Sequence, residues 1–163
     1  MTDSEAGSAS YDAEDGPVAP PMNRMVIAIL ALTGLFVALY LWAHNAGLTG
    51  PIQCGIGDCE TVQSSEYARI GPVPVSAIGV FGYAALMVLS FVGIQPGNRD
   101  STRIGALLLA GSTVGVAFSG YLTYLEAAVI QAWCQYCVIS AILMTLSFFA
   151  SLPEAARLRG TRA

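Results

Sequence analysis

Two pairs of cysteines are the residues of this sequence with the clearest capacity for chemistry. Cys54 and Cys59 are separated by four residues, two of them glycines, in a polar segment. Cys134 and Cys137 form a C-x-x-C pair between long apolar stretches. Electrons pass between such pairs when a thiolate attacks a disulfide, and the two halves of one exchange need two pairs. The cysteines therefore predict thiol–disulfide transfer.

Helical geometry favours a redox role for the second pair. Cys134 and Cys137 stand three residues apart near the expected start of a helix, so both sulfurs lie on one face within bonding reach. A helix N-terminus stabilises a thiolate, and C-x-x-C pairs often have lowered thiol pKa values. Other interpretations remain open. Cys134 and Cys137 could simply pack between helices, and Cys54 and Cys59 could form a static disulfide. All four could also bind zinc, although the Cys54–Cys59 spacing is unusual for a zinc site.

The composition indicates an integral membrane protein. Of the 163 residues, 55% are hydrophobic and 11% are charged, and the mean hydropathy is +0.61. Soluble domains carry about 25% charged residues, so this chain has too few to cover a surface facing water. Five of the eleven acidic residues lie in the first fifteen positions, within residues 1–21, which we predict to be a disordered tail. The seven bases form no cluster that would indicate nucleic-acid binding.

Four apolar segments predict an all-α bundle of four transmembrane helices. The first two are expected at about residues 25–44 and 75–94. The next apolar stretch, residues 104–152, would reach about twice the thickness of a membrane core as one helix. It must turn once, and we expect the turn near residues 126–129, which gives helices at about 104–126 and 130–151. The first segment is longer than the core of a signal peptide and follows an acidic tail, so we expect it to remain uncleaved.

The arginines predict the orientation of these helices. The first loop contains Arg69 alone. The other six arginines lie before the first segment, in the loop between the second and third segments, and after the fourth: Arg24, Arg99, Arg103, Arg157, Arg159, Arg162. The positive-inside rule then puts both termini, including a basic tail at residues 153–163, in the cytoplasm. Both cysteine pairs consequently lie on the extracytoplasmic side of the plasma membrane, where disulfides form.

Several stretches of the sequence together resemble the vitamin K epoxide reductase family in its bacterial form. They are residues 59–69 (CETVQSSEYAR), 74–83 (PVSAIGVFGY), 121–126 (YLTYLE) and 133–137 (WCQYC). The likeness extends from residue 25 to residue 152. Two cysteine pairs, a serine six residues after the second loop cysteine, and four spans all occur in the order of that family.

The resemblance implies a four-helix bundle that holds a quinone, menaquinone or ubiquinone, near the outer membrane surface under the first loop. Cys137 would face the quinone, and Cys134 would be its resolving partner, which exchanges with Cys59. Cys54 would meet a reduced, DsbA-like protein of the thioredoxin fold. Some relatives contain a fused thioredoxin-like domain, and here we expect the partner to be a separate protein.

The resemblance also assigns roles to two serines and shows two departures. Ser65 would match the family's loop serine, which helps to hold the loop over the site, and Ser76 matches a serine at the start of the second span. Animal members have an asparagine where this chain has Val75, and a tyrosine where it has Ala141. Those polar groups are associated with binding quinone or epoxide oxygens, so the departures favour a plain quinone over an epoxide as the acceptor.

The remaining candidates have two interpretations each. Glu126 is an ionisable residue near a membrane boundary, which makes it either a functional residue or the mark of a helix end. His44 lacks a histidine partner and is expected at a solvated helix end. Four aromatic residues could line a quinone pocket or anchor helices at the interface: Tyr121, Tyr124, Trp133, Tyr136.

Together these features predict a quinone-dependent thiol oxidoreductase that reoxidises its DsbA-like partner and supports disulfide formation outside the cytoplasm. A DsbA-type protein has a potential of about −120 mV, so its reoxidation needs a strong acceptor such as a quinone. The alternatives are a reductase of vitamin K quinone or epoxide, and a non-enzymatic membrane protein with structural or zinc-binding cysteines.

Overall fold

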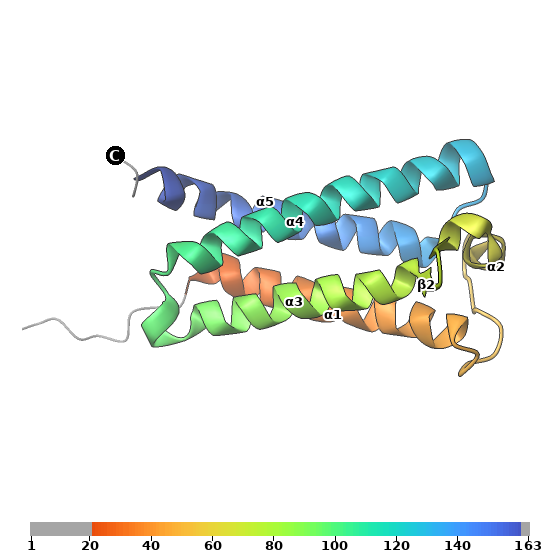
Figure 1. The fold of residues 1–163 in the computed structure, drawn as a ribbon, viewed down its shortest axis with the longest axis horizontal. Coiled ribbons are helices and arrows are strands. Elements are labelled where there is room, and N and C mark those ends of the chain that lie inside the picture. Colours follow the sequence, from red (N-terminus) through yellow and green to blue (C-terminus); the bar gives the residue numbers. More distant parts are fainter. Residues whose placement is uncertain (1–20, 161–163) are drawn as a thin grey trace, which may run out of the picture.

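Long apolar stretches of this chain form long helices that lie side by side (Figure 1). The computed structural model describes residues 21–160. The long helices are α1 (Met22–Asn45), α3 (Val75–Ile94), α4 (Thr102–Tyr124) and α5 (Gln135–Gly160). Within the described residues, four helices are long and apolar enough to cross a membrane. The predicted all-α bundle of four membrane-spanning helices is therefore confirmed.

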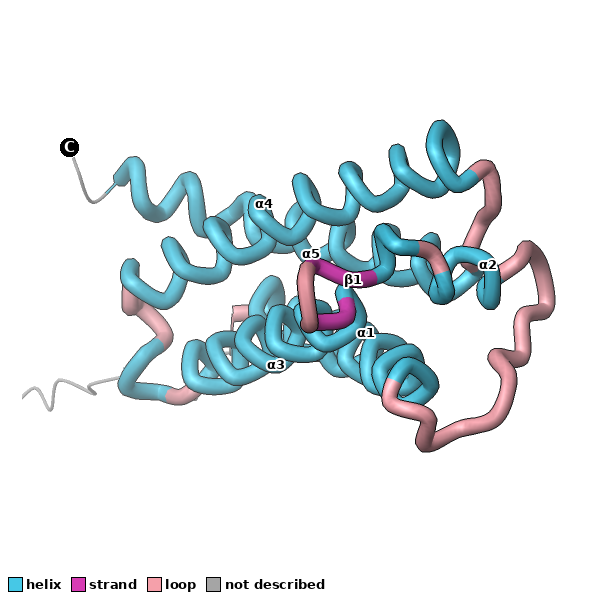
Figure 2. The backbone as a smooth tube through the Cα atoms, turned by 45° about the vertical axis from the view of Figure 1, so that its right-hand side comes forward, coloured by secondary structure: helices cyan, strands magenta, loops and turns pink. Residues whose placement is uncertain are grey.

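The segment between α1 and α3 folds over one end of the bundle. It contains α2 (Cys59–Ser64), the 3-10 turn η1 (Glu66–Ala68), and two short antiparallel strands, β1 (Arg69–Ile70) and β2 (Val73–Pro74). Figure 2 shows these elements beside the start of α5, with a long loop leading to them from α1. A second 3-10 turn, η2 (Pro96–Asn98), joins α3 to α4 at the opposite end.

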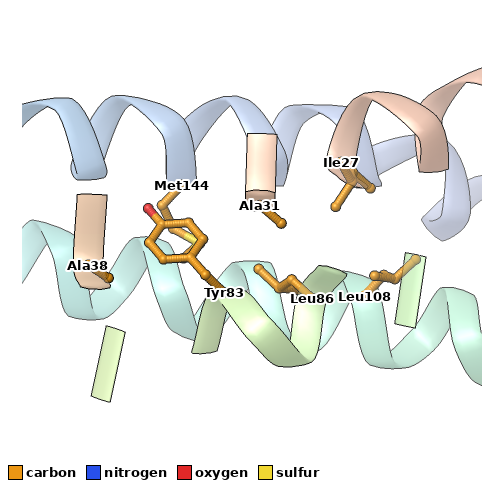
Figure 3. Close-up of a cluster of buried hydrophobic side chains, with 7 residues drawn as sticks. All are labelled: Ile27, Ala31, Ala38, Tyr83, Leu86, Leu108 and Met144. Atoms are coloured by element: carbon orange, nitrogen blue, oxygen red, sulfur yellow. The ribbon is translucent and has the colours of Figure 1, made fainter. Parts of the chain in front are cut away.

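Small residues let the helices approach closely around one large side chain. A Cβ atom on Gly34 of α1 would overlap the ring of Tyr83 from α3, so only glycine fits at this crossing. The Tyr83 hydroxyl donates a hydrogen bond of 2.8 Å to the carbonyl of Ser140 on α5. Figure 3 shows the cluster of buried side chains to which this tyrosine belongs: Ile27, Ala31, Ala38, Tyr83, Leu86, Leu108 and Met144.

The turn between the third and fourth spans lies later than the predicted residues 126–129. After Tyr124 the chain continues through η3 (Leu125–Ile130), which has the wider π-helical winding. It reverses at Gln131, whose φ of 57° lies in the left-handed region. The predicted turn was wrong because a π-helical segment preserves helical hydrogen bonding and needs neither glycine nor proline to mark its end.

The fourth span also extends beyond its predicted end. Helix α5 continues through Pro153 to Gly160, so residues 153–160, expected as part of a tail, are helical. Glu154 gives the physical reason, since it is 1% exposed and faces the bundle. The remainder of the predicted C-terminal tail, and residues 1–20 of the predicted N-terminal tail, lie outside the described residues.

A buried ion pair joins the helices at the end opposite the cysteines. The Nε atom of Arg24 on α1 lies 2.9 Å from a carboxylate oxygen of Glu154 on α5, and each residue is 1% exposed. The same guanidinium donates to the carbonyls of Gly93 and Asn98, at 2.9 and 3.1 Å. These contacts connect α1 and α5 with the end of α3 and the turn that follows it.

Candidate functional site

The loop cysteines form a disulfide at the start of α2. Cys54 and Cys59 are bonded, with their Cα atoms 6.1 Å apart. Cys59 is the first residue of the helix, and Asp58 caps it by accepting the backbone N–H of Thr61 at 3.0 Å. The hydroxyl of Thr61 also donates to this carboxylate, and both bonds lower the pKa of Asp58. Cys59 is buried and Cys54 is half-buried, so the two sulfurs differ in their access to solvent.

The second pair lies at the start of α5 as two free thiols. Cys134 is buried and immediately precedes the helix, and Cys137 is partly exposed in its first turn. A hydrogen bond from the Cys137 thiol lowers the pKa of Cys134 from 9.0 to about 7, with backbone N–H groups adding to the effect and burial opposing it. Cys134 is therefore the member of this pair that forms a thiolate near neutral pH.

Backbone contacts hold the loop against the C-x-x-C segment. The N–H of Asp58 donates to the carbonyl of Trp133 at 2.9 Å, and Gly57 pairs with Cys134 as an isolated bridge. Gly57 has a φ of 91°, and a Cβ atom there would overlap the Trp133 carbonyl oxygen. Glycine is thus required at this position both by the backbone conformation and by the close approach.

The two cysteine pairs meet in one buried cluster. Cys59, Val62 and Cys134 form its centre, and Cys54 and Cys137 pack against it. The side chain of Gln135 adds two further loop contacts, since its Oε1 atom accepts the N–H groups of Gly55 and Ile56 at 3.2 and 3.1 Å. The fold therefore brings together the sulfurs of two segments that lie far apart in the sequence.

A cavity of about 670 Å³ extends from this cluster between the four long helices. Its walls are largely apolar, and α2 contributes Val62 and Gln63 to it. Of the four cysteines, all within the described residues, Cys137 alone lines the cavity. An apolar chamber with one accessible sulfur is suited to an apolar, ring-shaped molecule that reacts at that sulfur.

Polar side chains approach Cys137 from two directions. The amide Nε2 of Gln63 lies 3.6 Å from the Cys137 sulfur. The carboxyl of Glu126, which is 3% exposed, interacts with the Cys137 thiol and accepts the backbone N–H of Cys134 at 3.1 Å. Gln63 was missed by the sequence analysis, although its position four residues after Cys59 on a helix indicated that both share a face.

Three of the other predicted site residues line the same cavity as Cys137, and one does not. Ser65, Ser76 and Glu126 all contribute to its wall. The Ser65 hydroxyl donates to the Val62 carbonyl at 2.7 Å and so bonds the backbone of α2. Tyr121 is 55% exposed and lines a separate, smaller pocket beside η1 and β1. The structure does not bring Tyr121 together with the cysteines.

The other aromatic candidates lie outside the large cavity. Tyr124 and Trp133 are exposed at 62% and 49%. The Tyr136 hydroxyl donates to the carbonyl of Gln53 at 2.9 Å, and its ring packs on Tyr40 with 5.1 Å between ring centroids. Tyr136 thus fastens the loop to α5.

His44 has a partner that the sequence did not indicate. Its Nε2 atom lies 3.5 Å from a carboxylate oxygen of Glu60 on α2, and its Nδ1 atom lies 3.1 Å from the carbonyl of Gly50. The imidazole therefore connects the end of α1 with the loop and with α2.

The donor groups do not converge as a metal site would require. Among residues 21–160, no three His, Cys, Asp or Glu side chains are grouped so as to hold a metal ion. Cys54 and Cys59 are bonded to each other, which removes two sulfurs from the four-cysteine zinc site considered from the sequence.

Comparison with known proteins agrees with this geometry. The thiol-disulfide oxidoreductase LTO1 of Arabidopsis thaliana is 32% identical over 105 residues, which make up 61% of this chain and 28% of that protein. The chain thus spans little more than a quarter of the length of this relative. The sequence model of the vitamin K epoxide reductase family matches residues 25–152, which include both cysteine pairs and the cavity. With well over half of its length matched, the chain belongs to the vitamin K epoxide reductase family.

Proposed function

We propose that this protein is a thiol oxidoreductase that passes electrons from a reduced, DsbA-like thioredoxin-fold protein to a quinone in the membrane. Membership of the family and the likeness to a thiol-disulfide oxidoreductase support the thiol chemistry. One observation carries the proposal further: the four sulfurs form a series that leads from the solvent-accessible loop to the apolar cavity. Cys54 is half-buried, Cys59 and Cys134 share a buried cluster, and Cys137 lines the cavity.

The residues of the cavity fit a quinone ring. Its walls are largely apolar, as a lipid-soluble molecule requires, and two of its polar side chains, Gln63 and Glu126, contact Cys137. Gln63 and Ser76 are the side chains that would donate to the ring oxygens, and Glu126, which accepts the backbone N–H of Cys134, would take the proton of the Cys137 thiol. A bound quinone, whether menaquinone or ubiquinone, supplies an acceptor for two electrons and two protons.

Electrons enter through the loop pair. A partner thiolate attacks Cys54 and releases Cys59, and the second partner thiol then resolves this mixed disulfide. The partner leaves oxidised, and Cys54 and Cys59 remain as a dithiol. The half-buried Cys54 is the accessible target for this attack, because Cys59 is only 1% exposed.

Transfer to the second pair follows by the same exchange. The Cys59 thiolate attacks Cys134 in the oxidised Cys134–Cys137 pair, and Cys137 leaves with the electron pair. Cys54 then attacks Cys59 and releases Cys134. A thiol of low pKa leaves faster, and the pKa of Cys134 is about 7.

The cycle closes when Cys134 and Cys137 form a disulfide and deliver two electrons and two protons to the quinone. Cys137 is the sulfur that lines the cavity, and Cys134, which is hydrogen-bonded to it, would form the disulfide with it. The arginine distribution supports an orientation with cytoplasmic termini and with both cysteine pairs at the extracytoplasmic face of the plasma membrane.

The test is quinone reduction by purified protein with either a reduced DsbA-like donor or a small dithiol. We expect Cys54→Ser and Cys59→Ser to abolish turnover with the protein donor, while the small dithiol still reduces the Cys134–Cys137 pair directly. Cys134→Ser and Cys137→Ser should be inactive with both donors. Quinone consumption by Cys137→Ser, or stoichiometric zinc in the purified protein, would contradict the proposal.

The choice between quinone and epoxide can be tested in the same assay. Val75 lines the cavity and supplies no hydrogen-bond donor where animal members have an asparagine. We therefore expect turnover with a quinone and none with vitamin K epoxide.

A further inference from the structure

We infer that the side-chain amide of Gln63, oriented by Asn45, donates the hydrogen bond that stabilises negative charge on the sulfur of Cys137. The inference rests on the proposed function, in which Cys137 reduces the quinone. It assigns a donor contacting the reacting sulfur and a second residue that positions this donor.

Three elements supply this arrangement. Gln63 of α2 places Nε2 at 3.6 Å from the sulfur of Cys137 in α5. Its Oε1 atom accepts a hydrogen bond of 2.9 Å from Nδ2 of Asn45, the last residue of α1. The Asn45 amide also contacts the hydroxyl of Ser76 at the start of α3, at 3.3 Å. A chain of polar groups thus leads across the end of the bundle to the reacting sulfur.

The direction of the Gln63 amide follows from a backbone carbonyl. An amide side chain has an acceptor oxygen and a donor nitrogen of nearly the same shape, so its orientation must be argued from its partners. The carbonyl oxygen of Leu41 lies 3.0 Å from one of these atoms of Asn45 and can only accept. That atom of Asn45 is therefore nitrogen. The Gln63 atom facing it must be oxygen, which directs the Gln63 nitrogen toward Cys137.

A donor at this position has a large effect because the surroundings are apolar. A charged sulfur facing an apolar cavity loses hydration, and a hydrogen bond from a neutral donor restores part of that stabilisation. The amide of Gln63 comes from α2. Because α2 belongs to the loop, the donor reaches Cys137 only when the loop covers the bundle.

Two substitutions of Gln63 test the donor directly. Gln63→Met keeps the length of the side chain and removes the donor, and Gln63→Glu presents an oxygen to the sulfur. Each is combined with Cys134→Ser, so that Cys137 is the only free thiol while the loop disulfide remains. Alkylation of Cys137 by a small maleimide at neutral pH is expected to slow by about ten- to a hundredfold. Gln95→Met, an exposed amide at the opposite end of the bundle, is the matched control.

Asn45→Asp tests the positioning role with an isosteric change. Aspartate can only accept, so the Gln63 amide should reverse and direct its oxygen toward Cys137. In the Cys134→Ser background we expect slower alkylation of Cys137. With Cys134 retained, we expect a lower kcat for quinone reduction with a small change in KM. Added to Gln63→Met, the same substitution should have no further effect, because the donor is already absent. A purely structural role for Asn45 would instead give additive losses.

The outcomes separate this inference from the proposed function. If the wild-type protein reduces no quinone, the proposed function fails, and the alkylation rates still test the amide. The inference is overturned if the wild-type protein reduces quinone and neither Gln63→Met nor Asn45→Asp has an effect. No effect means that Cys137 is alkylated at an unchanged rate in the Cys134→Ser background and that quinone is reduced at the wild-type rate when Cys134 is retained. Formation of the Cys54–Cys59 disulfide and an unchanged Tm identify the variants that have folded. Should Gln63→Met fail these checks, the nearly isosteric Gln63→Glu and Asn45→Asp decide the question.

Discussion

Removing the thiol of Cys137 should raise the pKa of Cys134 from about 7 toward its ordinary value of 9.0. The hydrogen bond from Cys137 is the largest effect that lowers this pKa, and burial acts in the opposite direction. Cys137→Ala removes the thiol donor and leaves both the burial, which raises the pKa, and the backbone N–H donors, which lower it by a smaller effect than the thiol. Cys137→Ser retains a hydroxyl donor, so in that variant the pKa of Cys134 should stay below 9.0.

The expected magnitude follows from this difference. A shift from about 7 to 9.0 corresponds to about 2.7 kcal/mol of lost thiolate stabilisation. At pH 7 the thiolate fraction of Cys134 would fall from about one half to about one in a hundred, a change of about fiftyfold. Because the thiolate is populated above the pKa, nucleophilic exchange through Cys134 should decline as the pH falls through 7 in the wild-type protein. In Cys137→Ala the decline should begin near pH 9.

Ultraviolet absorbance of the thiolate measures this directly, because each variant contains Cys134 as the single free thiol while the loop disulfide is intact. The titration is compared between Cys137→Ala and Cys137→Ser, with non-reducing electrophoresis to verify the disulfide. A midpoint near 7 in Cys137→Ala would refute the assignment of the low pKa to the Cys137 hydrogen bond.

Three further changes address other parts of the fold. Gly57→Ala should slow turnover with the protein donor at least about tenfold, because an alanine with the positive φ of this position has a strained backbone, which costs about 1–3 kcal/mol. Turnover with a small dithiol should be unchanged. Equal losses with both donors would count against this prediction. Glu154→Gln should lower the free energy of unfolding in detergent by about 3–5 kcal/mol by leaving the Arg24 charge buried and unpaired; a change below 1 kcal/mol would contradict this. Glu126→Gln should slow quinone reduction by about a hundredfold, because an amide cannot take the Cys137 proton; stopped-flow absorbance measures the rate, and an unaltered rate would exclude that role.

Local patterns in the sequence were sufficient to predict the membrane bundle. The second predicted span, residues 75–94, coincides with α3 (Val75–Ile94), because Pro74 precedes it and a polar stretch beginning at Gln95 follows it. Such boundaries are encoded by neighbouring residues. The turn at Gln131 is different, because a glutamine with positive φ after a π-helical segment has no distinctive local composition.

The polar groups around Cys137 depend on contacts between distant segments. Gln63 could have been suspected from its spacing to Cys59. Its partner Asn45 lies on another helix, so their contact could be predicted only from the path of the loop between α1 and α2. The pairing of Arg24 with Glu154 likewise joins the two ends of the chain. Sequence patterns reveal which faces are apolar, whereas the partner of a single buried polar group depends on how the helices are arranged.

The two ends of the bundle are held by interactions of different strength, and this difference suits a redox cycle. At one end the buried ion pair of Arg24 and Glu154 joins the first and last helices, and removing either partner is costly. At the other end the loop is held by hydrogen bonds such as that from Asp58 to Trp133, each contributing about 0.5–1.5 kcal/mol. In the proposed cycle the loop pair faces a partner protein and the buried Cys134 in turn. The weaker contacts can break for this movement while the ion pair keeps the helices and the cavity assembled.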